Sequence, residues 1–153
     1  MTTSPDPYRL FFPLGILLGL AGVAIWPLNY FGFITGYWGM SHAFIQADGF
    51  LFCFIAGFLL TALPRFTSTE VPSIGIQAIL ACVVLSGSIA MELQQYSIAQ
   101  MLFAISYALL FALAALRFAN RKGQLPPTFT LVGLGILAAL IAAVINALTE
   151  YNA

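Results

Sequence analysis

Five long apolar stretches constrain this chain more than any other feature of its sequence. A helix that crosses a bilayer needs about 20 mostly apolar residues, and five stretches of the 153-residue chain meet that length. The chain carries only five Lys or Arg and five Asp or Glu residues, which are too few to cover a water-exposed surface and exclude an ordinary soluble domain. We therefore predict an all-α polytopic membrane protein, a single helical domain over residues 1–153 with spans at about 10–30, 42–63, 73–91, 96–118 and 127–149.

Proline residues mark several of the predicted helix ends. Pro64 is expected to stop the second span, because proline lacks the N–H that a helix interior needs. Pro72 precedes the third span, and the pair Pro126–Pro127 precedes the fifth. Only residues 92–95 join the third and fourth spans, so a tight hairpin is predicted there without Gly or Pro.

The basic residues predict the orientation of the chain. With five spans, all of them fall on one side of the membrane, and the positive-inside rule makes that side cytoplasmic. The N-terminus is then cytoplasmic and the C-terminus external, with Arg9 as an anchor at the start of the first span. A net charge of zero and the lack of a basic run exclude nucleic acid as a partner. The basic residues are Arg9, Arg65, Arg117, Arg121 and Lys122.

Small residues recur four positions apart in the first two spans. They are Gly15 and Gly19 in the first span and Gly49, Cys53 and Gly57 in the second. Because such spacing lets helix backbones approach closely in lipid, it predicts a packing seam between helices.

Most other polar or sulfur-containing side chains within the spans are expected to serve packing. Cys53 and Cys82 show no paired metal-ligand spacing, so both are interpreted as small apolar packing residues. Interhelical hydrogen bonds are expected from Gln77, Ser86, Ser88, Gln100, Ser106, Tyr107 and Asn146.

The second span carries the candidate functional groups His42, Gln46 and Asp48. At 3.6 residues per turn, His42 and Gln46 share a stripe with the small residues, so both should point into the bundle. Asp48 lies about 9 Å deeper than His42 and about a third of a turn away. An aspartate within the hydrocarbon costs about 2.5–3.5 kcal/mol and is by default a functional candidate. It would either fix helix packing through hydrogen bonds, or act as a proton relay or as a partner that orients a ligand.

His42 is the only histidine in the chain. It is interpreted either as a hydrogen-bonded boundary residue or as a ligand, since neutral imidazole commonly binds haem iron and copper. One chain cannot supply a bis-histidine haem site or a three-histidine copper site. A second ligand would come from Met40, Met91 or Met101, or from His42 of a second copy.

Two stretches of this sequence resemble the NnrS family. Residues 8–12, Tyr-Arg-Leu-Phe-Phe, resemble the Phe-Arg-Pro-Phe-Phe that leads into the family's first span. His42-Ala43, Gly49-Phe50 and residues 55–64, Ile-Ala-Gly-Phe-Leu-Leu-Thr-Ala-Leu-Pro, resemble its second span and exit. The remaining spans are similar only in being apolar, so the chain is interpreted as a shortened or divergent relative that matches in the N-terminal two spans.

The resemblance implies a multi-pass protein of the bacterial cytoplasmic (inner) membrane. The family comprises bacterial membrane proteins that contain haem and copper and are linked to nitric oxide metabolism and nitrosative stress. It implies haem bound at His42, with Gln46 and Asp48 tuning or orienting the site. The family pattern His-Ala-His-Glu-Met continues here as Phe44, Ile45 and Gln46 after the first two residues. The missing second imidazole argues against copper.

Three hypotheses of function follow. The first is an NnrS-like protein that binds haem through His42 and acts in the nitric oxide response or in electron transfer. The second is a non-catalytic membrane interaction module without metal. The third is a small transporter or channel subunit that uses Asp48. Besides the lipid bilayer, a homo-oligomer or a larger membrane complex is the expected partner.

Overall fold

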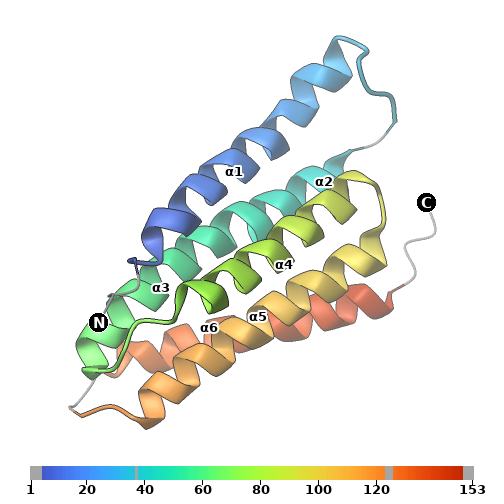
Figure 1. Cartoon of the computed structure of the whole chain (residues 1–153). Helices are drawn as coiled ribbons and strands as arrows, with labels where there is room; N and C mark the ends of the chain where they lie inside the picture. Colours follow the sequence, from blue (N-terminus) through green and yellow to red (C-terminus); the bar gives the residue numbers. More distant parts are fainter. Residues whose placement is uncertain (1–4, 37, 123–125, 150–153) are drawn as a thin grey trace.

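The described residues form a bundle of long helices. The computed structural model describes residues 5–36, 38–122 and 126–149, and these residues contain no β-strand (Figure 1). Five helical segments are long and apolar enough to cross a membrane, which confirms the predicted all-α fold with five spans. They are Tyr8–Tyr30, Gly39–Thr67, Ile74–Glu92, Tyr96–Ala119 and Thr128–Leu148.

The second of these segments is a composite of three helices. A short helix α2 (Gly39–Phe44) continues into a π-helix η1 (Ile45–Leu51) and then into α3 (Phe52–Thr67). The other segments are single helices: α1 (Tyr8–Tyr30), α4 (Ile74–Glu92), α5 (Tyr96–Ala119) and α6 (Thr128–Leu148).

Successive spans run in alternating directions and pack side by side (Figure 1). α1 packs against the second span, α4 packs against α5, and α5 lies between α4 and α6 and also contacts α3. The core takes buried side chains from every span, among them Phe11, Phe52, Val84, Phe103 and Ile136. Most of the large apolar side chains of α6 are exposed, which shows that α6 lies at the edge of the bundle.

Pro64 does not end the second span, so that predicted boundary is wrong. α3 continues through Pro64 to Thr67 and ends where Ser68 adopts a left-handed conformation with φ of 54°. Pro64 lies in the last turn of the helix, where its missing N–H removes a single hydrogen bond. The hydroxyl of Thr67 donates to the Leu63 carbonyl at 2.7 Å and so supports this last turn.

The hairpin between α4 and α5 is as tight as predicted. Gln94 supplies the left-handed residue of the turn, with φ of 56°, a role that glycine usually fills. Its N–H donates to the Met91 carbonyl at 3.0 Å, and the N–H of Gln95 donates to the Ala90 carbonyl at 2.9 Å.

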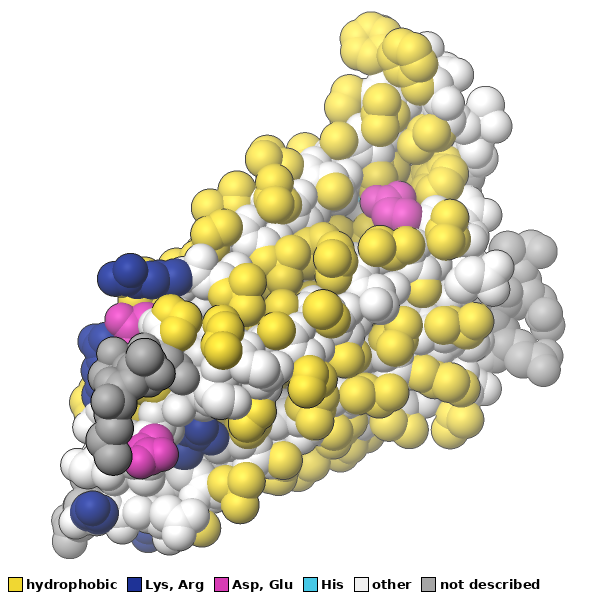
Figure 2. Space-filling model, in the orientation of Figure 1, with side chains coloured by type: hydrophobic (Ala, Val, Ile, Leu, Met, Phe, Trp, Pro, Cys, Tyr) yellow, Lys and Arg dark blue, Asp and Glu magenta, His cyan; other side chains and the backbone are white. Residues whose placement is uncertain are grey.

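All five basic residues lie at one end of the bundle, which we call the basic end. Arg9 is in the first turn of α1 and Arg65 in the last turn of α3, while Arg117 is near the end of α5. Arg121 and Lys122 follow α5, and the backbone N–H of Lys122 donates to the carbonyl of Thr67, the last residue of α3, at 3.2 Å. On the face that Figure 2 shows, Lys and Arg side chains gather at this end and hydrophobic side chains cover most of the length between the ends.

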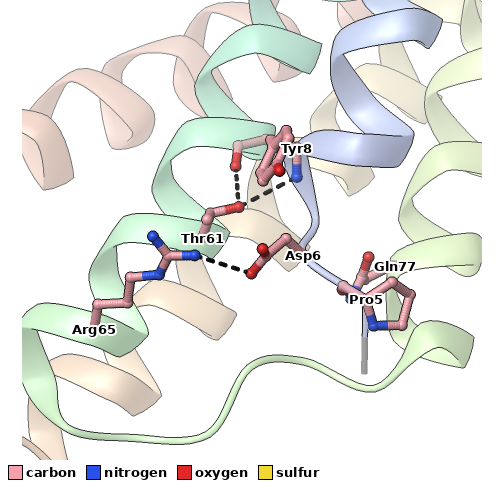
Figure 3. Close-up of polar contacts among 7 residues, drawn as sticks. Pro5, Asp6, Tyr8, Thr61, Arg65 and Gln77 are labelled. Atoms are coloured by element: carbon pink, nitrogen blue, oxygen red, sulfur yellow. Dashed lines mark hydrogen bonds and ion pairs between the residues drawn. The ribbon is translucent and has the colours of Figure 1, made fainter. Parts of the chain in front are cut away.

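At the basic end, the start of α1 is held against α3 by polar contacts (Figure 3). The guanidinium of Arg65 lies 3.2 Å from the carboxylate of Asp6, in an exposed ion pair. The backbone N–H of Tyr8 donates to the hydroxyl of Thr61 at 3.2 Å, and that hydroxyl donates to the Gly57 carbonyl at 2.7 Å. These contacts fix where α1 begins relative to α3.

Candidate functional site

The three candidate site residues lie in or next to the π-helix η1. Its backbone bonds join residues five apart instead of four, so each turn is wider than in the flanking helices, and this changes which side chains share a face. Asp48 lies in the middle of η1, Gln46 near its start, and His42 one turn before it, in α2. Single turns of π-helix inside α-helices are frequent at functional sites.

His42 faces α1 and is bonded to its backbone. Its Nδ1 atom lies 2.9 Å from the carbonyl oxygen of Gly22. Because a carbonyl oxygen can only accept, Nδ1 carries a proton and donates it, which in the neutral tautomer places the lone pair on Nε2. The half-buried ring also packs against Trp26, with 5.3 Å between ring centroids. The contact with α1 therefore fixes both the position and the tautomer of the imidazole.

Gln46 makes a matching contact with α1 one helical turn further along. Its side-chain Nε2 donates to the carbonyl of Gly19 at 2.9 Å. The contact needs the absence of a side chain at Gly22, where an added Cβ would lie 2.8 Å from that same Nε2 atom. The prediction that His42 and Gln46 point into the bundle is confirmed, since each bonds to a backbone carbonyl of α1.

The small residues of the first two spans form the predicted packing seam. A Cβ added at Gly15 would lie 3.0 Å from Cβ of Cys53, and one at Gly57 would lie 2.8 Å from the ring of Phe12. Cys53 is fully buried in this seam. Cys82 is exposed on α4, so the interpretation as a small apolar packing residue is confirmed for Cys53 but is wrong for Cys82 within this bundle. Hydropathy alone does not show which face of α4 is turned outward.

Asp48 faces α5 instead of α1. The hydroxyl of Tyr107 donates to its Oδ1 at 2.9 Å, and Nε2 of Gln100 lies 3.5 Å from its Oδ2. Gln100 is fully buried, and its Oε1 has no hydrogen-bond partner among the described residues. The structure thus brings the side chains of His42 and Gln46 together against α1 and places Asp48 in a separate cluster with residues of α5.

Comparison with known proteins identifies the family of the chain. The family model described as NnrS protein matches residues 4–153. The chain belongs to the NnrS family. The match covers nearly the whole length, so it extends well beyond the two spans whose residues carry the resemblance. No curated protein and no solved structure matches the chain.

In this NnrS chain, the predicted interhelical bonds form only in part. The prediction is confirmed for Gln100 and Tyr107, which bond to Asp48. Gln77 donates to the carbonyls of Pro5 and Pro72, which lie in the segments that precede α1 and α4. Within the described ranges no bond to another helix forms at Ser86, Ser88, Ser106 or Asn146. The hydroxyls of Ser88 and Ser106 donate to the carbonyl four residues earlier in their own helix, because a short serine side chain reaches that carbonyl first.

The donor set of the NnrS chain limits which metal groups it could hold. No three His, Cys, Asp or Glu side chains come together as a metal site in the part of the chain that the structure describes. Among the methionines considered as a second ligand, Met91 is fully buried in the core and Met101 is half-exposed on α5. His42 is therefore a candidate ligand for a metal-containing group that needs only one imidazole from this chain.

Proposed function

We propose that this NnrS protein binds haem through Nε2 of His42 and acts in the nitric oxide response or in electron transfer in the bacterial inner membrane. The observation that carries the proposal is the hydrogen bond from His42 Nδ1 to the Gly22 carbonyl. Histidines that ligate metals commonly donate their other ring N–H to a carbonyl or carboxylate, which orients the ring and makes the ligating nitrogen more basic.

The proposal requires a haem held by one proximal histidine, and His42 is the residue that would hold it. Haem iron in several protein classes is bound by a single imidazole, and the bond from His42 Nδ1 to the Gly22 carbonyl leaves Nε2 as the ring nitrogen for a ligand. Haem bound at His42 would supply an iron that can bind nitric oxide or pass an electron. Copper is not part of the proposal, because the described residues form no cluster of three donor side chains.

The other two candidate residues have different roles in this proposal. Gln46 is a positioning residue, since its bond to Gly19 holds α1 against the second span close to His42. Asp48 bonds to Tyr107 and Gln100 on α5, so we assign it to helix packing and not to the haem site. Each assignment predicts a different consequence of mutation.

Purified protein expressed with added haem should show a Soret absorption band that is lost in His42→Ala. Asp48→Asn is the control, and it should keep the band because the Asp48 carboxylate bonds to Tyr107 and Gln100 on α5. Gln46→Ala should keep a weakened or shifted band, since it loosens α1 without removing the ligand. Equal bands in wild type and His42→Ala would refute ligation by His42. Equally colourless wild-type and variant proteins would favour the metal-free interaction module.

We also propose that the basic end lies in the cytoplasm, with the external C-terminus that this orientation requires. The support is the gathering of all five basic side chains at one end of the bundle, combined with the positive-inside rule. Alkaline phosphatase fused to the C-terminus should be active, and a green fluorescent protein fused there should be dark. A fluorescent fusion with an inactive phosphatase would reverse the orientation and place His42 near the cytoplasmic face.

A further inference from the structure

Two apolar grooves flank the contact between α3 and α6 near the basic end. The larger, about 390 Å³, is lined by α3, α5 and α6, and the smaller, about 340 Å³, by α3 and α6. Leu59, Phe129 and Val132 line both grooves, so these three residues form the ridge between them. The rings of Phe66 and Phe129 meet edge to face with 5.6 Å between centroids and hold α6 against the end of α3.

Two basic residues, Arg121 and Lys122, follow α5 at the basic end, next to Phe118 at the end of the larger groove. Phe118 lines that groove, and the guanidinium of Arg121 lies 4.2 Å from the centre of its ring. Arg121 also donates to the Phe118 carbonyl at 2.8 Å, and the backbone of Lys122 is bonded to the end of α3. Both side chains are exposed, and the one ion pair that the described residues form involves neither of them. The open end of the groove therefore carries positive charge without a counterion from the described chain.

We propose that this surface binds one anionic glycerophospholipid of the leaflet at the basic end. Its two acyl chains would occupy the two grooves on either side of Val132, and its phosphate would lie against Arg121 and Lys122. Two apolar grooves beside two uncompensated cations match a ligand with two chains and a negative headgroup. Basic pockets between membrane helices on the cytoplasmic side are typical sites for such headgroups.

Charge also favours a lipid over a second copy of the chain as the occupant. A parallel copy packed on this face would bring its own Arg121 and Lys122 to the same end and would increase the repulsion between like charges. An anionic lipid removes that repulsion. It would also cover apolar side chains of α6 that the bundle leaves exposed.

Native mass spectrometry of the delipidated protein tests the proposal with two lipids of identical acyl chains. Wild type should retain phosphatidylglycerol about tenfold more than phosphatidylcholine, given the attraction of basic residues for anionic lipid. The double variant Arg121→Gln/Lys122→Gln should lose most of this preference while its retention of phosphatidylcholine stays unchanged. Val132→Phe narrows both grooves and should lower the retention of both lipids.

Matched controls separate the site from general properties of the membrane surface. Val144→Phe introduces the same ring on the same helix outside the grooves, at a position 43% exposed against 40% for Val132. Arg9→Gln removes an exposed basic side chain at the same end but outside the two grooves. Both controls should retain phosphatidylglycerol as wild type does, and all variants should unfold at the wild-type detergent concentration.

Three results would overturn the proposal. Equal retention of the two lipids by wild type would show that the headgroup charge is not recognised. An unchanged preference in Arg121→Gln/Lys122→Gln would show that these cations do not hold the phosphate. A lipid-free dimer that Val132→Phe dissociates would assign the face to a contact between copies of the chain.

Discussion

Replacing Gly57 with leucine is expected to lower the free energy of unfolding by about 3 kcal/mol, the upper part of the range for overpacking a core. A Cβ at this position would lie 2.8 Å from the ring of Phe12 and 3.1 Å from Cβ of Phe11, and Phe11 is fully buried. The leucine would force α1 away from α3 and open the packing seam. Unfolding by sodium dodecyl sulfate in mixed micelles, followed by circular dichroism, measures the loss.

Gly133→Leu is the matched control for this prediction. It places the same side chain on α6, where no heavy atom lies within 4 Å of an added Cβ. Its free energy of unfolding should equal that of wild type or exceed it slightly, because leucine favours a helix more than glycine does. If both leucine variants unfold at the same detergent concentration, the close approach of α1 and α3 at Gly57 is wrong.

Tyr107→Phe is expected to cost about 1–3 kcal/mol of stability, the range for leaving a buried polar group without its partner. The variant loses only the hydroxyl that donates to Asp48 Oδ1 at 2.9 Å. Gln100 donates to the other carboxylate oxygen, at 3.5 Å, so it does not supply a donor for Oδ1. The same detergent titration measures this loss, and the Soret band should be unaffected because Asp48 lies apart from His42.

A double-mutant cycle tests whether the stability lost in Tyr107→Phe comes from the hydrogen bond between Tyr107 and Asp48. Tyr107→Phe should cost less than about 0.5 kcal/mol in an Asp48→Leu background, where no carboxylate remains to be satisfied. Tyr30→Phe removes the same hydroxyl at a residue that is 84% exposed, so it should leave stability unchanged. An equal cost of Tyr107→Phe with and without Asp48 would contradict the bond between α5 and η1.

The positions of the five spans could be predicted from the sequence because lipid leaves the backbone few choices. Every N–H and C=O in the hydrocarbon must be bonded internally, so length and hydropathy locate the helices to within a few residues. The gathering of basic residues at one end followed from the number of spans. The end of the second span could not be predicted from Pro64, because the left-handed residue Ser68 sets it.

The sequence predicts which residues form the candidate site. It does not predict their hydrogen-bond partners, because these depend on which helices are neighbours. Helical periodicity indicated the face of His42 and Gln46 but not that α1 would cover it. Gly22, which accepts the bond from His42, follows Gly19 by three residues, so the four-residue spacing of small residues does not include it. The π-helix and the pairing of Asp48 with Tyr107 arise from packing between spans, for which a single sequence holds no local pattern.

Chemical rescue of His42→Gly tests the role of His42 most directly. The variant removes the imidazole and leaves space where the ring was, so imidazole added to the buffer should occupy it and bind the haem in its place. We predict that the Soret band, present in wild type and absent from His42→Gly, returns as imidazole is titrated into the haem-supplied variant. A His42→Gly protein with the haem content and Soret band of wild type before imidazole is added would contradict haem ligation by His42.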